Sequence, residues 1–517
     1  MTPDPWSGVH LPSPAVGIAF AVTAIVLLIG AQLAYRALIP VAGFATAWQL
    51  RRHMSGRSAH RVVKVTRPSL VGQRGVPVQE YSYRLGRSYS PFLVARCTPE
   101  DCALVLGPPG VGKSALIGDI VVDAPGAVVH TTSKIGDVDT TAAARALVGP
   151  VLVFNPLGLG GVESTLRVNP VRGCKDPRVA VERGAALLYG SRSNGDGGGL
   201  QDYFTNNANE VLRAFLMAAD IAGLTLVDVH RWANDPKCTD ALKILTRGGA
   251  PETWTDALRA RQEVTERTRD GIFSTLATAL SWLSDPAAVY AVTPAAGEDF
   301  DVARFLAARG TLYMVGEDTA GVGVAPLFTM LINDVVTEAV RLADHQPGRR
   351  LDPYLTLALD EVATICPVPL DQWINKLRAH GVLLIAGIQS KAQLYDRWGK
   401  SGGDAIWNAA AATVVFGGLK SAEDLREIST LCGEREVRRR SVQHTAAGPI
   451  RSEHDELRPV MPPHKIRNLR KRRALVLYRG LPPVIVRVRQ PWRRRDVRQA
   501  SSSVHTLVRS SYAGGGA

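Results

Sequence analysis

The chain has 517 residues, of which 46% are hydrophobic and 21% are charged. This length allows two or three domains with at least one large core, and the ordinary apolar content excludes a protein that crosses a membrane many times. The 61 Lys and Arg residues exceed the 47 Asp and Glu residues and give a net charge of +14, which favours nucleic acid or an anionic membrane as a partner, unless the charge serves only solubility.

Residues 1–45 predict a membrane anchor. No charged residue occurs at 12–35, and about 20 apolar helical residues are enough to cross a bilayer. The basic residues of the following juxtamembrane segment, 46–95, place the N-terminus outside and the remainder of the chain in the cytoplasm by the positive-inside rule. A second apolar stretch at 37–50 is too short to cross alone and lies at the interface or forms half of a hairpin. We therefore expect a single-pass or two-pass protein of the cytoplasmic membrane; a buried core helix is the alternative.

A glycine-rich turn, LGPPGVGKS, lies between an apolar run at 103–107 and a helical pattern at 113–122. Its spacing is that of a P-loop, in which glycines let successive backbone N–H groups face one phosphate group. Lys113 is expected to reach the β- and γ-phosphates of ATP, and Ser114 to complete the shell of a Mg²⁺ ion. The predicted nucleotide-binding residues are Gly107, Pro108, Pro109, Gly110, Val111, Gly112, Lys113 and Ser114.

A second buried-strand pattern, YLTLALDE, ends in the two carboxylates of Asp360 and Glu361. A P-loop needs an acidic element on a neighbouring strand, so we expect Asp360 to hold Mg²⁺ and Glu361 to orient or deprotonate the attacking water. Taken alone, an Asp-Glu pair is also compatible with the plain end of a strand. The P-loop favours the catalytic interpretation.

Two further candidates flank the next strand pattern, VLLIAGI at 382–388. Gln389 follows this strand and is predicted to sense the γ-phosphate or its water, although a residue that only caps the strand is the alternative. Arg378 precedes the strand and is a candidate for a cation that a neighbouring subunit presents to the transition state. A solvated arginine at a helix end is the alternative for Arg378.

The remaining patterns predict an α/β fold with a parallel sheet. Between 177 and 295 the pattern becomes helical and strand signals vanish. We therefore expect an all-helical domain at 177–295 inserted into a RecA-like P-loop core at 96–176 and 296–490. The further predicted strands of this core begin at Gly126, Val151, Gly310 and Thr413.

Arginines concentrate past residue 435, in REVRRR, KIRNLRKRR and PWRRRDVR. Arginine binds phosphates through bidentate, salt-sensitive contacts, so these clusters are expected to bind the phosphate backbone of a nucleic acid. A surface that only keeps the protein soluble is the alternative. Residues 491–517 are first basic and then rich in serine. This segment is predicted to be a disordered tail.

Several stretches together resemble the type IV coupling proteins of conjugative DNA transfer, the TraG/TraD-like class, in an actinobacterial-type version. They include LGPPGVGKSALIGDI, LYMVGEDTAGVGVAPLFTMLIND and LTLALDEVATICPVPLDQWINKLRAHGVLLIAGIQSKAQLYDRWG. The resemblance implies a membrane-anchored homo-hexameric ATPase that receives a relaxase with single-stranded DNA and passes the strand to type IV secretion channel proteins. It also implies the residue roles given above, including that of Arg378 as an arginine acting in trans.

Three alternatives remain open at the level of the sequence. An FtsK-like double-stranded DNA translocase would normally end in a compact DNA-reading winged helix, which the Ser-rich tail does not resemble. A nucleotide-switched receptor would dock the substrate with negligible hydrolysis. A protein-secretion ATPase of related build would respond to a protein cargo instead of DNA.

Overall fold

The computed structural model describes residues 22–26, 28, 42–88, 93–191, 199–317, 323–445 and 448–502. Within these residues one large sheet contains the strands β1 (Tyr83–Ser88), β2 (Val94–Cys97), β3 (Ala103–Leu106), β4 (Val128–Thr132), β5 (Val151–Phe154), β6 (Thr311–Val315), β7 (Leu355–Leu359), β8 (Val382–Ile388), β9 (Ala412–Phe416), β12 (Arg473–Tyr478) and β13 (Val484–Arg487). Their order in the sheet is β2-β1-β13-β12-β9-β3-β8-β7-β4-β6-β5.

The half of the sheet from β9 to β5 is parallel and carries the core of the protein. Its strands are apolar on both faces, as parallel strands covered by helices require. Leu106 of β3 belongs to the core under α15 (Ala325–Asp344), and Val105 belongs to the core under α5 (Lys113–Asp123). The predicted α/β fold with a parallel sheet is confirmed, because each predicted apolar run forms one of these strands.

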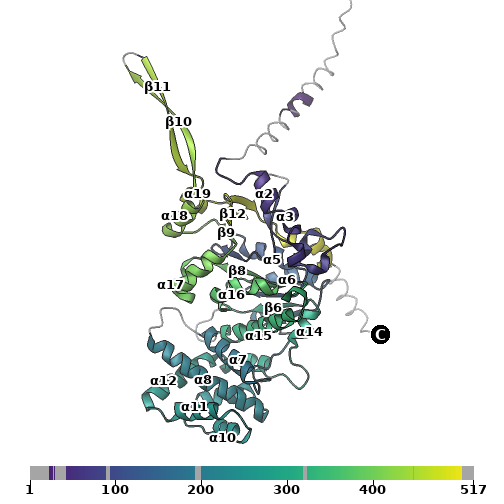
Figure 1. The fold of residues 1–517 in the computed structure, drawn as a ribbon, viewed down its shortest axis with the longest axis vertical. Coiled ribbons are helices and arrows are strands. Elements are labelled where there is room, and N and C mark those ends of the chain that lie inside the picture. The colour runs from purple at the N-terminus through teal and green to yellow at the C-terminus, as the bar shows by residue number, and fades with distance from the viewer. Residues whose placement is uncertain are drawn as a thin grey trace, which may run out of the picture.

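Between 177 and 292 the described residues contain helices joined by short loops and no strand, and they lie at the end of the molecule remote from β9 (Figure 1). The long helix α8 is surrounded by its neighbours, and α7 packs against α15 on the sheet. One apolar core therefore runs from the helices into the sheet. The helices are α7 (Pro177–Ser191), α8 (Gly199–Ala222), α9 (Leu226–Ala233), α10 (Asp240–Arg247), α11 (Glu252–Glu263), α12 (Glu266–Ala279) and α13 (Pro286–Val292).

A long hairpin of β10 (Glu434–Thr445) and β11 (Gly448–Pro459) projects from the body of the protein beside α18 (Ala422–Leu431) (Figure 1). It contains the first of the predicted basic clusters. Acidic side chains face these arginines across the hairpin: Arg438 and Asp455 approach to 3.5 Å. Part of the positive charge is therefore balanced within the hairpin.

Two predicted boundaries differ from the structure. The juxtamembrane segment was expected to extend to residue 95, but β1 and β2 extend the antiparallel edge of the sheet. The tail was expected to be disordered from residue 491, but residues 491–502 are ordered as far as the described chain extends. Val497 is buried against α6 (Ile135–Arg145), and Arg494 forms ion pairs with Asp119 and Asp123 of α5. The local sequence of this segment is typical of a solvated basic tail. Ion pairs with acidic residues that lie far away in the sequence hold it in an ordered position.

Most of the predicted membrane span at 12–35 lies outside the described residues. Among the residues that are described, no helix combines the length and the apolar character that crossing a bilayer would need.

A buried carboxylate, Asp101, ties the two halves of the sheet together. It is fully buried and accepts hydrogen bonds from Tyr478 at 3.0 Å and from Arg479 at 2.5 Å. We expect Asp101→Ala to destabilise the protein by about 3 kcal/mol, because it leaves these donors without their partner. Thermal unfolding of the full chain in detergent, compared with Asp235→Ala at an exposed loop position, measures this effect. Equal midpoints for the two variants would contradict it.

Candidate nucleotide-binding and hydrolysis site

The P-loop connects β3, in the middle of the parallel strands, to the first turn of α5. Gly110 and Gly112 have φ values of +80° and +124°, which disfavour residues with a Cβ atom. At Gly107 the obstacle is steric, because an added Cβ would lie 2.8 Å from Cβ of Phe416. The glycines identified in the sequence are therefore required by the shape of the loop. This shape leaves the N-terminus of α5 available for an anion.

Lys113 is folded onto its own loop. Its ammonium group is buried and donates a hydrogen bond to the carbonyl oxygen of Gly107 at 2.6 Å. Burial lowers the pKa of Lys113, while the charges of Asp360 and Glu361 oppose this effect. A phosphate beside the loop would offer this ammonium a charged acceptor in place of a neutral carbonyl.

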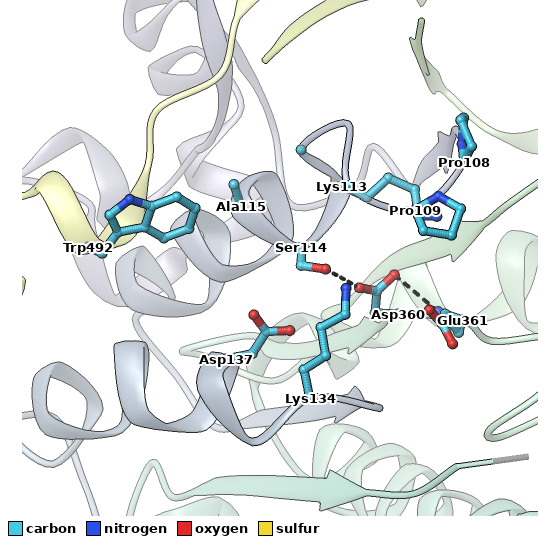
Figure 2. Close-up of a pocket in the computed structure, with 12 residues that line it drawn as sticks. Pro108, Pro109, Lys113, Ser114, Ala115, Lys134, Asp137, Asp360, Glu361 and Trp492 are labelled. Carbon is cyan, nitrogen blue, oxygen red and sulfur yellow. Dashed lines mark hydrogen bonds between the residues drawn. The ribbon is translucent and has the colours of Figure 1, made fainter. Parts of the chain in front are cut away.

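The structure brings Ser114 and Asp360 together across 246 positions of sequence. The Ser114 hydroxyl donates to a carboxylate oxygen of Asp360 at 2.8 Å (Figure 2). Asp360 follows β7, which is separated from β3 by β8 alone. The carboxyl ends of these parallel strands meet at one edge of the sheet, and this explains the encounter.

Glu361 lies beside Asp360 in the same pocket and has an unusual backbone. Its φ of +53° is left-handed, and its N–H donates to the other carboxylate oxygen of Asp360 at 3.1 Å. Burial, and next the charge of Asp360, raises the pKa of Glu361. A carboxylate with a raised pKa is a better proton acceptor, which suits a general base. Strained backbone of this kind occurs at functional sites.

One pocket contains most of the predicted residues. Two of the predicted P-loop residues, Gly107 and Val111, are not among the residues that line this pocket. Both instead support the conformation of the loop, and the Val111 carbonyl accepts a hydrogen bond from the N–H of Arg472 at 3.0 Å. The lining residues are Pro108, Pro109, Gly110, Gly112, Lys113, Ser114, Ala115, Lys134, Asp137, Asp360, Glu361 and Trp492.

Sequence reasoning missed four of these residues: Ala115, which follows Ser114 in α5, and also Lys134, Asp137 and Trp492. Lys134 and Asp137 follow β4, which neighbours β7, and the Thr132 hydroxyl donates to Asp137 at 2.9 Å. The signal that could have found them is their position after a central parallel strand, since such loops line ligand sites. Trp492 was missed because residues 491–517 were predicted to form a disordered tail.

Gln389 and Arg378 are not among the pocket-lining residues of the described chain. Gln389 follows the carboxyl end of β8, at the edge of the sheet that carries the P-loop, and its backbone N–H donates to Gln393 at 2.8 Å. Arg378 is exposed in the short helix η6 (Leu377–His380), which precedes the amino end of β8. A strand of this length separates the two ends by about 20 Å. Arg378 therefore cannot reach the pocket of its own chain.

Comparisons with known proteins identify the family and the structural relatives of this chain. A model of the family described as type IV secretory system conjugative DNA transfer matches residues 60–513. The conjugal transfer protein TraG of Agrobacterium fabrum is 23% identical over 309 residues, which cover 57% of this chain and 45% of that protein. The probable conjugal transfer protein TraG of Sinorhizobium fredii is 24% identical over 320 residues, covering 59% and 48%. The chain thus spans about half the length of these curated relatives.

Solved structures share the fold. The bacterial conjugative coupling protein TrwBdeltaN70, in its unbound monoclinic form, superposes with a TM-score of 0.57 at 17% identity, covering 86% of this chain and 94% of that chain. The plasmid coupling protein TrwB in complex with a non-hydrolysable ATP analogue superposes with a TM-score of 0.53 at 20% identity, covering 77% and 88%. With the family model extending over most of the sequence, this chain belongs to the type IV secretory system conjugative DNA transfer family.

Proposed function

We propose that this chain is a membrane-anchored ATPase that couples a relaxase–DNA substrate to a type IV secretion channel and drives single-stranded DNA transfer in conjugation. The family and the conjugal transfer names of its TraG relatives support the role in DNA transfer. The observation that carries the ATPase activity is the contact of 2.8 Å between Ser114 and Asp360. It joins the phosphate-binding loop to the acidic end of a strand.

The residues at this site fit ATP and Mg²⁺. Ser114 and Asp360 offer hard oxygen donors already in contact with each other, which suits Mg²⁺. When bound, the ion would neutralise charge on the phosphates. The loop N–H groups and Lys113 would hold the phosphates, and TrwB, which has the same fold, was solved with ATP and GTP analogues.

Glu361 is the proposed general base. As the oxygen of the attacking water bonds to the γ-phosphorus, the bond from that phosphorus to the bridging oxygen breaks and ADP leaves. The carboxylate of Glu361 accepts the proton that the water loses. Lys113 stabilises the charge that develops on the phosphate oxygens.

A homo-hexameric ring would place Arg378 in the site of a neighbouring subunit. Arg378 is exposed at the opposite edge of the sheet from its own P-loop, which leaves its side chain accessible to a neighbouring subunit. The ring would lie at the cytoplasmic membrane, with the N-terminus outside and the ATPase domain in the cytoplasm.

Mixing two inactive variants tests this shared site. We expect Arg378→Ala to retain ATP but to hydrolyse it about 10³-fold more slowly, because the transition state loses its trans-acting charge. Adding a Lys113→Ala chain is expected to restore part of the activity, since some interfaces then combine an intact P-loop with an intact arginine. Arg247→Ala, at an exposed position of α10, is the matched control. Full activity of Arg378→Ala alone, or no recovery on mixing, would contradict a shared site.

The full chain in detergent tests the proposed function directly, through ATP hydrolysis without DNA, with single-stranded DNA and with double-stranded DNA. We expect stimulation by single-stranded DNA and its loss in Glu361→Gln. Stimulation by double-stranded DNA alone would identify an FtsK-like pump. Negligible hydrolysis under all conditions would identify a nucleotide-switched receptor, and hydrolysis that ignores DNA would point to a protein-secretion ATPase.

A further inference from the structure

An aromatic side chain, Trp492, lines the nucleotide pocket at the end away from the acidic pair (Figure 2). In Figure 2 it lies beyond Ser114 and Ala115, whereas Asp360 and Glu361 lie on the other side of Ser114. A triphosphate with its γ-phosphate at Asp360 and Glu361 would extend its nucleoside in the opposite direction. Trp492 therefore stands where a nucleobase would lie.

The segment that carries Trp492 is held on α5 by two arginines, one on each side of Trp492 in the sequence. Arg489 contacts Asp119 at 2.7 Å and Asp123 at 2.8 Å. Arg494 contacts the same carboxylates at 2.9 and 2.7 Å. Asp119 is only 2% exposed, so this network is largely shielded from water and fixes the segment on the P-loop helix.

The start of the same C-terminal segment is fixed to the P-loop itself. Arg472 donates its backbone N–H to Val111 at 3.0 Å, and its guanidinium donates to Gln490 at 2.7 Å. The loop that binds phosphate and the segment that carries Trp492 are therefore parts of one rigid unit. Such a unit presents the aromatic ring at a defined place without needing a ligand to order it.

The exposure of Trp492 argues against a purely structural anchor. Its neighbour Pro491 is buried and approaches Gly118 of α5, which gives the segment an apolar contact of its own. Trp492 instead remains 48% exposed and borders the pocket. A large ring left half in water beside a ligand site is suited to stacking on a flat ligand.

We propose that Trp492 is the nucleobase-binding residue of this site, stacking on the purine ring of a nucleoside triphosphate held by the P-loop of the same chain. This inference rests on the proposed nucleotide-binding function and adds the group that recognises the base. Because the indole ring stacks on the flat face of the base, Trp492 is expected to bind adenine and guanine equally well. The C-terminal segment thereby becomes part of the nucleotide site.

The test compares binding of ATP, GTP and inorganic tripolyphosphate to the full chain in detergent by titration calorimetry. We expect Trp492→Ala to weaken ATP and GTP by between about 5- and 150-fold, the range found when base-stacking aromatic residues are removed. Tripolyphosphate, which has no base, is expected to bind as it does to the wild type. Trp492→Phe keeps an aromatic face and is expected to retain most of the affinity, and Trp48→Ala, an exposed tryptophan outside the pocket, serves as the control.

Unchanged ATP affinity in Trp492→Ala would overturn the inference. Equal weakening of ATP and tripolyphosphate would also overturn it, because Trp492 would then act only on the shape of the P-loop. In both cases, if Lys113→Ala binds neither ATP nor tripolyphosphate, the proposed nucleotide site at the P-loop would still be supported. Wild-type chains that bind neither ATP nor tripolyphosphate would overturn the proposed function together with this inference.

Discussion

Glu361→Gln is expected to lower the rate of ATP hydrolysis by about 10²- to 10⁴-fold, the usual contribution of a positioned general base. The amide has nearly the shape of the carboxylate but cannot accept the proton of the attacking water. The backbone N–H that binds Asp360 is unaffected, so the metal-binding part of the site is expected to survive. The affinity for ATP should therefore stay within a few-fold of the wild type, because we expect the free energy of ATP binding to change by about 1 kcal/mol or less.

Steady-state phosphate release, together with ATP binding by calorimetry, measures both quantities. Glu263→Gln, at an exposed position on α11, removes the same charge far from the pocket-lining residues and controls for the charge change itself. A variant that hydrolyses ATP at the wild-type rate would remove Glu361 from the mechanism. Loss of ATP binding in Glu361→Gln would instead assign this carboxylate to binding.

Lys113→Ala is expected to abolish DNA transfer between cells and to reduce ATP hydrolysis by at least about 10²-fold, because one preorganised charge on the phosphates is lost. Lys113 is buried and bonds a loop carbonyl, so its removal also leaves Gly107 without this donor. Relaxase nicking of the DNA is expected to continue, since this protein would act after that step.

The measurement counts transconjugants and scores nicked DNA in donor cells that carry Lys113→Ala, with Lys237→Ala as the matched exposed lysine. Equal levels of the two proteins in the donor cells establish that both variants accumulate. Wild-type transfer by Lys113→Ala would eliminate the coupling role, and loss of nicking would move the protein to an earlier step.

The buried parallel strands could be predicted from sequence because each is a continuous apolar run bounded by turn residues. The run before Gly107 and the run before Asp360 identify two such strands, and a P-loop requires an acidic element at the end of a nearby strand. This also explains why Ser114 and Asp360, far apart in sequence, could be assigned to one site.

The missed elements have charged sequences whose partners are distant. The strand β10 begins as EREVRRR and reads as a basic cluster, since acids such as Asp455 that oppose it lie on β11. Arg494 reads as part of a solvated tail, but Asp119, which orders it, lies 375 positions earlier. The local order of residues in the sequence predicts well which apolar side chains are buried. It does not predict which charged side chains form ion pairs with each other.

We propose that the P-loop and the acids after β7 form one hydrolytic site. An experimental structure of the assembled full chain with Mg²⁺ and a non-hydrolysable ATP analogue would test this proposal. We predict the triphosphate on the loop, Ser114 and Asp360 at the metal, and Glu361 within hydrogen-bond reach, about 2.6–3.2 Å, of the water that faces the γ-phosphorus. A triphosphate bound elsewhere, or acids that stay out of reach of the metal and of that water in every subunit, would contradict the account.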